Sequence, residues 1–180
     1  MPPFYIQHSL RLRISHLFCV VFCSCTLRVS FPISLVLKYI QELADYEKMS
    51  DGPKIDVDRL RDDGFGKEKF FRCFVADAGD KLVGYSLYFF SYSTWEGISV
   101  FLEDLYVNPE YRNLGLGIGL WKKVAEVAVA KKCNRLDWVC LCWNKTSIAF
   151  YKSKGAVNIT DKDGWNIYRL TGDNLKQFAA

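Results

Sequence analysis

The chain has 180 residues, of which 50% are hydrophobic and 24% charged, so it can bury a sizeable core and is not a largely disordered protein. This length fits one domain. The charges are unevenly spread, because residues 1–34 hold three arginines and no acidic residue. The remainder is close to neutral, with 21 basic against 20 acidic residues, which argues against a nucleic-acid-binding protein.

Residues 1–34 form an atypical leader with a composition of its own. Its apolar stretch, 17–22, is far shorter than the roughly 20 residues that span a bilayer, so no membrane association is expected from it. Basic residues before a short apolar run are typical of a signal peptide, but no clear cleavage site follows. Three interpretations stay open: a secretion signal, an alternative or mistaken first exon, and a genuine anchoring or strand-forming leader, since residues 10–14 alternate as a half-buried strand would.

Histidine and cysteine usage restricts the chemistry. Both histidines, His8 and His16, lie in the leader, so a histidine-dependent nucleophile or metal site is not expected in the rest of the chain. The seven cysteines are an odd number and lack the CxxC spacing of a zinc site. We therefore expect no metal, and we interpret the cysteines as buried, reduced thiols of a cytoplasmic protein.

The elements expected after the leader are helices, an antiparallel meander, a helix, a strand, a helix and a strand. Periodicity predicts helices at 35–46, 56–66, within 110–132 and at 147–154, and strands at 70–77, 81–92, 98–107, 136–142 and 165–170. The strand at 136–142 is apolar nearly throughout, which indicates burial on both faces. Together these elements predict a single α/β domain over 35–180, with a mixed, mostly antiparallel sheet flanked by helices.

The most informative motif is the run from Arg112 to Gly117, RNLGLG, between an expected strand and an expected helix. Glycines there let backbone N–H groups approach a phosphate, and the helix dipole favours the anion. A P-loop would need Gly-Lys-Ser/Thr, which is lacking, and a dinucleotide fingerprint would need a small residue at position 120, where this chain has leucine. The remaining interpretation is the Arg-x-x-Gly-x-Gly turn of acetyl-CoA binding.

Six ordered stretches accompany this turn: ELADYEKM, DGFG, YSTWEG, FLEDLYVNPEYRNLGLGIG, WNKTSIAFYKSKGA and GWNIYRL. With them, residues 35–180 resemble the GNAT superfamily of acetyltransferases, in particular the diamine acetyltransferase branch with spermidine/spermine and thialysine N-epsilon-acetyltransferases. The resemblance implies the GNAT acyl-CoA N-acyltransferase fold. It also implies acetyl-CoA as co-substrate, a small-molecule amine as acceptor, and a homodimer.

The resemblance also implies the residues that hold acetyl-CoA. The strand backbone of Leu105, Tyr106 and Val107 would meet the pantetheine arm. The pyrophosphate would be wrapped by Asn113, Leu114, Gly115, Leu116, Gly117 and Ile118, with Arg112 at the turn. Asn144 and Ser147 match the family's second cofactor contact.

For catalysis, the resemblance gives Tyr151 the place of the general acid and Glu103 that of a carboxylate near the amine or its ordered water. The expected substrate contacts are Tyr46, Glu47, Trp95, Glu103 and Asp104. These roles fit the chemistry, because an alkylammonium with a pKa of about 10.4 must lose a proton before it attacks a thioester, and the departing thiolate must gain one. Without the surrounding motif, Glu103 and Asp104 would be interpreted as a solvated strand end and Tyr151 as a packed helix aromatic. Tyr46 and Glu47 would be interpreted as an exposed helix end.

Two departures from the family pattern matter. Polyamine-acetylating members have an aspartate two residues before the tryptophan of YSTW, whereas this chain has Ser93, as thialysine-type enzymes do. The family's first strand is also missing or replaced, because the leader stands in its place. We therefore expect an acetyl-CoA-dependent N-acetyltransferase that prefers thialysine. The alternatives are a spermidine/spermine enzyme, a non-catalytic acyl-CoA-binding module and a membrane-tethered protein.

Overall fold

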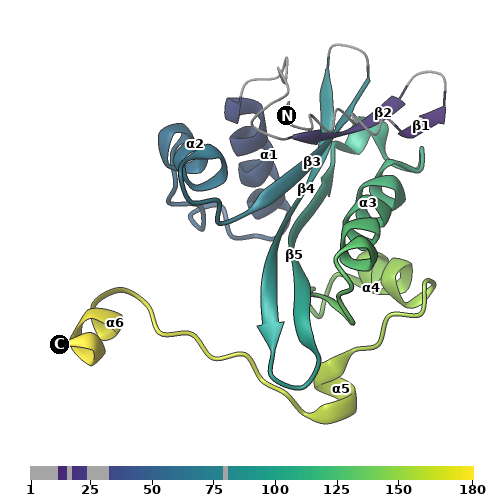
Figure 1. Ribbon diagram of the computed structural model, residues 1–180. Helices are drawn as coiled ribbons and strands as arrows, with labels where there is room; N and C mark the ends of the chain where they lie inside the picture. The colour runs from purple at the N-terminus through teal and green to yellow at the C-terminus, as the bar shows by residue number, and fades with distance from the viewer. Residues whose placement is uncertain (1–11, 16–17, 24–32, 79–80) are drawn as a thin grey trace, which may run out of the picture. The chain divides into compact units, whose positions relative to one another are not determined.

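The computed structural model describes residues 33–78 and 81–180, together with the backbone of 12–15 and 18–23. The chain divides into two compact units, Met1–Val139 and Cys140–Ala180, and each is described by itself. The first unit contains β1 (Leu12–Ser15), β2 (Phe18–Cys23), α1 (Ile33–Tyr46), α2 (Val57–Phe65), β3 (Arg72–Asp77), β4 (Leu82–Ser93), β5 (Gly97–Val107), the 3₁₀ turn η1 (Pro109–Tyr111), α3 (Leu116–Ala130) and β6 (Leu136–Trp138). Figure 1 labels these elements except η1 and β6. The second unit contains α4 (Lys145–Lys152), α5 (Ile159–Asp163) and α6 (Gly172–Ala179).

The strands of the first unit form one mixed sheet in the order β1-β2-β3-β4-β5-β6. Neighbouring strands are antiparallel except β5 and β6, which are parallel and are connected through α3. A parallel pair needs such a crossover, since a short hairpin cannot join its ends. The mixed, mostly antiparallel sheet flanked by helices confirms the expected fold class. Gly79 and Asp80 predict a turn between the strands expected at 70–77 and 81–92, and this turn lies outside the described residues.

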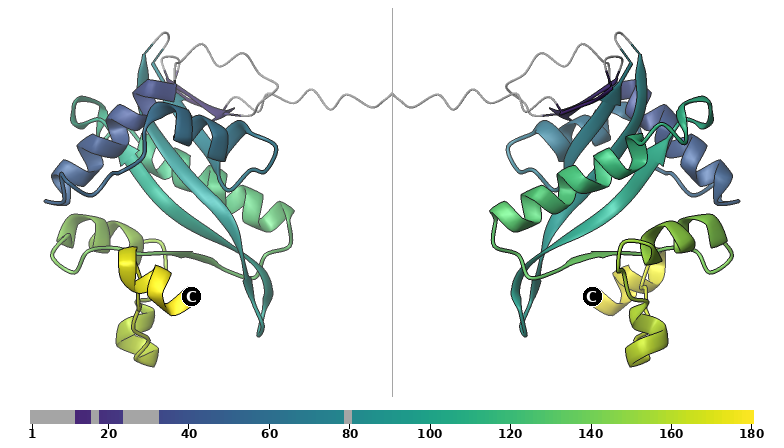
Figure 2. Two further views of the ribbon diagram at one scale, coloured as in Figure 1. Left: turned by 90° about the vertical axis from the view of Figure 1, so that its left-hand side faces the viewer. Right: turned by 90° about the vertical axis from the view of Figure 1, so that its right-hand side faces the viewer.

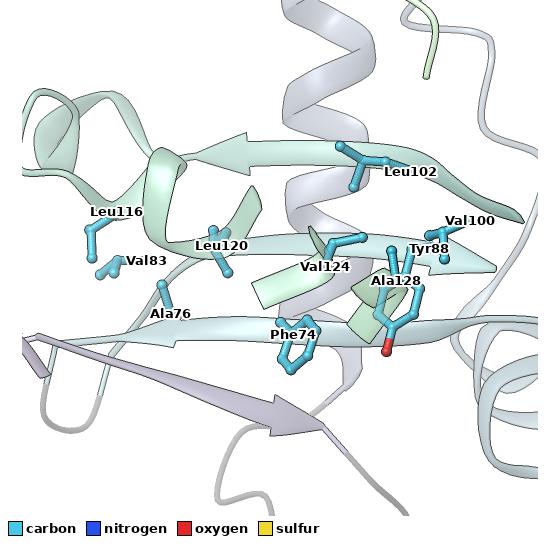
Figure 3. Close-up of a cluster of buried hydrophobic side chains, with 10 residues drawn as sticks. All are labelled: Phe74, Ala76, Val83, Tyr88, Val100, Leu102, Leu116, Leu120, Val124 and Ala128. Atoms are coloured by element: carbon cyan, nitrogen blue, oxygen red, sulfur yellow. The ribbon is translucent and has the colours of Figure 1, made fainter. Parts of the chain in front are cut away.

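Helices cover both faces of this sheet, α1 and α2 on one side and α3 on the other (Figure 2). The cluster on the α3 side, hereafter the α3-side cluster, consists of Phe74, Ala76, Val83, Tyr88, Val100, Leu102, Leu116, Leu120, Val124 and Ala128 (Figure 3). The α1-side cluster consists of Val36, Tyr39, Leu60, Cys73, Val75, Leu82, Tyr85, Leu87 and Tyr106. The helical period predicted for α3 is confirmed, because Leu120, Val124 and Ala128 are buried.

A β-bulge interrupts the pairing of β4 with β5. Leu87 pairs with Asp104 and Tyr88 pairs with Leu102, so Glu103 is an extra residue without an opposite partner. The bulge changes which residues face each side of the sheet. Leu102, before it, packs in the α3-side cluster, whereas Tyr106, four residues later, packs in the α1-side cluster. An extra residue of this kind redirects the side chains that follow it.

The leader contributes two strands to the sheet. β2 pairs with β3 from Cys19 opposite Asp77 to Cys23 opposite Cys73, and β1 pairs with β2 as an edge strand. The sequence indicated a strand near residues 10–14, and β1 at Leu12–Ser15 is close to it, but β2 was not expected. The helix α1 begins at Ile33, two residues before the expected start of the domain.

Three expectations near the C-terminus are wrong. The strand expected at 136–142 ends at Trp138, because it pairs with β5 only as far as Leu102. Cys140 and Cys142 therefore lie outside the strand and are exposed rather than buried. Residues 165–170 form no strand within the described chain, since an extended segment becomes a strand only when another strand supplies hydrogen-bond partners.

A chain that begins at Ile33 is expected to unfold at a temperature lower by about 5 °C or more, measured by circular dichroism. It loses the β2–β3 pairing, in which each hydrogen bond contributes about 1 kcal/mol net. We expect the shortened chain still to bind acetyl-CoA, because every cofactor position lies at or after Leu105. A folded, shortened chain that cannot bind acetyl-CoA would place the leader inside the active domain.

Candidate active site

The glycine turn, residues 112–118, leads from η1 into the first turn of α3. Asn113 and Gly115 both have positive φ angles, +63° and +81°, so the backbone reverses sharply before the helix begins. The first N–H groups of a helix have no partner within it and point outward along the axis. No acidic residue occupies the first turn of α3. This helix terminus therefore suits a phosphate group.

Gly117 leaves open the space next to this terminus. A Cβ atom built at Gly117 meets only Val107 Cγ2, at 3.8 Å, which is an ordinary contact. The glycine turn thus packs against the last residue of β5, four residues beyond Glu103. The cradle and its donors fit the pyrophosphate that the resemblance implies.

The free edge of β5 runs from this turn toward the bulge. β6 pairs with β5 only from Val100 to Leu102, so within the described residues of the first unit the backbone of 103–107 has no strand partner on that side. Leu105 and Val107 pack their side chains toward the α3-side cluster, while Tyr106 is buried against α1. An extended chain can bind such an edge through its backbone groups.

Arg112 ties the glycine turn to α1. Its Nε donates a hydrogen bond to the Val107 carbonyl at 2.9 Å. Its guanidinium carbon lies 5.6 Å from the ring centroid of Tyr46 and 5.9 Å from that of Tyr106. Contacts of this length are cation–π interactions. Arg112 therefore joins the end of α1, where a substrate contact was expected, to the expected phosphate site.

Three carboxylates, hereafter the carboxylate cluster, come together near the bulge: Glu47, Glu103 and Asp104. Burial, opposed by a hydrogen bond from Tyr85 and assisted by the negative charges of Glu103 and Glu47, raises the pKa of Asp104 to about 6. Burial also raises the pKa of Glu47. The structure thus brings Glu47, which follows α1, near the carboxylates of β5, and their contact with a substrate stays a prediction. Closely spaced carboxylates attract a cationic amine.

Trp95 lies away from this cluster within the same chain. It stands in the turn between β4 and β5, about 20 Å along the strand from Glu103, and 81% of its surface is exposed. Ser93 is buried, and its Oγ accepts hydrogen bonds from the N–H groups of Trp95 at 3.2 Å and Glu96 at 3.3 Å. Ser93 therefore shapes the turn that presents Trp95.

The remaining predicted residues belong to the second unit. Asn144 is the N-cap of α4, and its side chain accepts a hydrogen bond from the Ser147 N–H at 3.2 Å. Tyr151 lies in the last turn of α4, partly buried, with its ring centroid 5.3 Å from that of Phe150. Asn144 and Ser147 thus build the start of the helix that carries Tyr151.

Two hydrogen bonds from tyrosines to carboxylates were not predicted from the sequence. Tyr85, which is fully buried, donates a hydrogen bond to Asp104 Oδ2 at 3.0 Å. Tyr106 donates one to Glu42 Oε2 at 2.5 Å, which links β5 to α1. Both tyrosines occupy apolar strand patterns that indicate packing alone, and only the strand pairing brings their hydroxyls to carboxylates.

Two further features are absent from the described residues. Within them, histidine, cysteine, aspartate and glutamate form no group of three or more that could hold a metal ion. Among the described helices, none is long and apolar enough to cross a membrane.

Known proteins identify the family. The model of the acetyltransferase (GNAT) family matches residues 37–156. The chain is 46% identical over 152 residues to thialysine N-epsilon-acetyltransferase of Bos taurus. This alignment covers 80% of this chain and 89% of that protein. It is 33% identical over 151 residues to the spermidine/spermine N(1)-acetyltransferase-like protein 1 of Homo sapiens, covering 80% of this chain and 22% of that protein.

A solved structure supports the fold. An integron cassette protein from the mobile metagenome of V. cholerae superimposes with a TM-score of 0.71 at 24% identity, covering 92% of this chain and 99% of that one. At this identity the likeness speaks for the fold alone. The matching family model and the two relatives carry the assignment further: this chain belongs to the acetyltransferase (GNAT) family.

Proposed function

We propose that this protein transfers the acetyl group of acetyl-CoA to the side-chain amine of a small molecule, with thialysine preferred. The observation that carries the proposal is the carboxylate cluster at the bulge of β5, four residues before Val107, against which a glycine turn suited to a phosphate packs. The end of this strand at Val107 can hold the anionic cofactor, and the bulge at Glu103 can attract a cationic acceptor. The Bos taurus relative, whose name specifies thialysine, supports this choice of amine.

The proposed reaction needs a proton removed and a proton supplied. A carboxylate of the cluster, Glu103 in our assignment, takes a proton from the ammonium through water, and the neutral amine attacks the thioester carbonyl. The C–S bond then breaks, and Tyr151 protonates the CoA thiolate. As the adduct collapses, its nitrogen loses a second proton to solvent. Solvent also restores the phenol proton and takes the proton held by the carboxylate, so the products are the N-acetylated amine, free CoA and one released proton.

The preference among amines is expected to follow position 93. The sulfur of thialysine withdraws electrons and makes its amine more acidic than that of lysine, so more of it is unprotonated at neutral pH. We expect kcat/KM for thialysine to exceed that for spermidine in an acetyl-CoA turnover assay of the purified protein. Ser93→Asp should shift the ratio toward spermidine, because an added carboxylate attracts a second ammonium.

A matched control for this variant is Thr94→Asp. It adds the same charge to the same turn at an exposed position, leaving the Ser93 hydrogen bonds intact. Equal shifts in both variants would show a general charge effect, and position 93 would not determine specificity. A clear preference of the unmodified protein for spermidine would overturn the proposed substrate.

A spermidine/spermine acetyltransferase is the second candidate. The human relative supports it, because its name specifies spermidine and spermine. The carboxylate cluster is also compatible with a polyamine, which carries several ammonium groups. The same turnover assay distinguishes the two candidates.

We further propose that the protein is a cytoplasmic homodimer. Tyr92, Trp95 and Ile98 are all exposed around one β-turn, and a second copy could cover them. In such a dimer Trp95 could reach an amine bound to the partner, since it lies a strand's length from the cluster of its own chain. The described cysteines, at 73, 133, 140 and 142, form no disulfide, which supports a reducing compartment. A monomer in sedimentation equilibrium would refute the dimer.

A further inference from the structure

We propose that Tyr85 is a positioning residue of the amine site, which fixes the direction and the ionised state of Asp104 through its hydroxyl. The inference rests on the proposed function, in which Asp104 binds the substrate ammonium. Tyr85 itself does not touch the substrate, since none of its surface is exposed.

The strand pairing explains how Tyr85 reaches Asp104. Tyr85 pairs with Tyr106 and Leu87 pairs with Asp104, so Tyr85 and Asp104 are diagonal neighbours across β4 and β5. Such neighbours are within reach of a long aromatic side chain. The hydroxyl of Tyr85 donates to Asp104 Oδ2 at 3.0 Å, which holds that oxygen in place and leaves Oδ1 for another donor.

Packing alone does not explain the hydroxyl of Tyr85. The ring belongs to the α1-side cluster, where a phenylalanine would fill nearly the same volume. Burying a phenol without a partner costs free energy, and here a carboxylate is its partner. The hydroxyl of Tyr85 therefore serves to bind Asp104, which a phenylalanine ring could not do.

The groups around Asp104 come from three elements. Glu103 precedes it on β5, Glu47 follows the end of α1, and Tyr85 lies on β4. Burial and the two negative charges favour the protonated carboxyl and raise its pKa to about 6, whereas the Tyr85 hydrogen bond lowers the pKa. Without the phenol, the pKa of Asp104 should rise further. A protonated Asp104 would attract an ammonium less strongly at neutral pH.

The test compares Tyr85→Phe with Tyr88→Phe. Tyr88 is a matched control, because it is equally buried in β4 but packs in the α3-side cluster. For each protein, kcat/KM for the amine is measured from about pH 5.5 to 9 at saturating acetyl-CoA. The ionisation of the amine affects all three proteins alike. A difference between their acid limbs, the low-pH sides of the kcat/KM profiles, therefore reports an ionisation of the protein.

We expect the acid limb of Tyr85→Phe to move upward by about one pH unit, which is about a tenfold loss of kcat/KM on that limb. The loss should shrink toward pH 9, where Asp104 is ionised in every variant. Tyr88→Phe should keep the limb of the unmodified protein, and acetyl-CoA affinity should not change in either variant. A folded Tyr85→Phe protein with an unmoved limb would overturn the inference.

A second measurement uses the unmodified chain and does not depend on the variant folding. The ¹³C resonances of the Asp104 carboxyl and of Tyr85 Cζ, assigned with Asp104→Asn, are followed through a pH titration. Both should shift at the same midpoint, and a Tyr85 resonance insensitive to Asp104 would overturn the inference. If the unmodified chain acetylates no amine at all, the proposed function fails. If it does, and the coupling is absent, only the role of Tyr85 fails.

Discussion

Replacement of Tyr151 by phenylalanine is expected to lower kcat about 10- to 1000-fold and to leave acetyl-CoA affinity nearly unchanged. Loss of a general acid slows the chemical step by about this factor. The phenol carries its proton at neutral pH, since its ordinary pKa is about 10, and so it is available to the departing thiolate. Single-turnover kinetics measure the chemical step, and calorimetry measures the affinity.

Tyr168→Phe provides the control for this result. Tyr168 belongs to the same unit of the chain but has 90% of its surface exposed. It should retain the kcat of the unmodified protein. If Tyr151→Phe also kept that rate, Tyr151 would be a packing residue of α4 beside Phe150, and another group would supply the proton.

Gly117→Val is expected to weaken acetyl-CoA binding at least tenfold without unfolding the protein. The added methyl groups would project from the first turn of α3 into the space that a pyrophosphate needs. The fold should tolerate them, because the Cβ atom meets only Val107 Cγ2 at 3.8 Å. Valine is also more favourable than glycine inside a helix, by a few tenths of a kcal/mol of helix propensity.

The control for this variant is Lys122→Val, which adds a valine to the same helix at an exposed position outside the first turn. It should bind acetyl-CoA as the unmodified protein does. Calorimetric affinity and the free energy of unfolding are compared for both variants. Unchanged affinity of a folded Gly117→Val protein would mean that the glycine turn does not hold the cofactor.

The central meander and α3 were predictable from the sequence, because their patterns depend on local rules. Aromatic and β-branched residues alternate through β3, β4 and β5, and the period of Leu120, Val124 and Ala128 directs one face of α3 to the sheet. β2 was not predictable, since its pairing with β3 joins segments about 50 residues apart. The prediction of a strand at 165–170 was wrong for a similar reason. The residue types there are typical of a strand, but they do not show whether a neighbouring strand is present to pair with it.

The candidate site was predictable to the extent that motifs carry it. The glycine turn and the residues Glu47, Glu103 and Asp104 are read from short stretches, and the structure brings the three carboxylates together. The contacts of Tyr85 and Arg112 could not be read in this way. The first depends on a one-residue bulge, and the second on where the end of α1 meets β5.

The bulge at Glu103 makes β5 two half-strands in opposite phase. Up to Leu102 the even-numbered residues face α3, whereas beyond the bulge Leu105 and Val107 do so. If Glu103 were paired as an ordinary strand residue, without the bulge, the even-numbered residues would continue to face α3 and Tyr106 would turn away from α1. Val107 would also move from beside Gly117. The bulge therefore decides which side chains of residues 104–107 face α1 and which face α3.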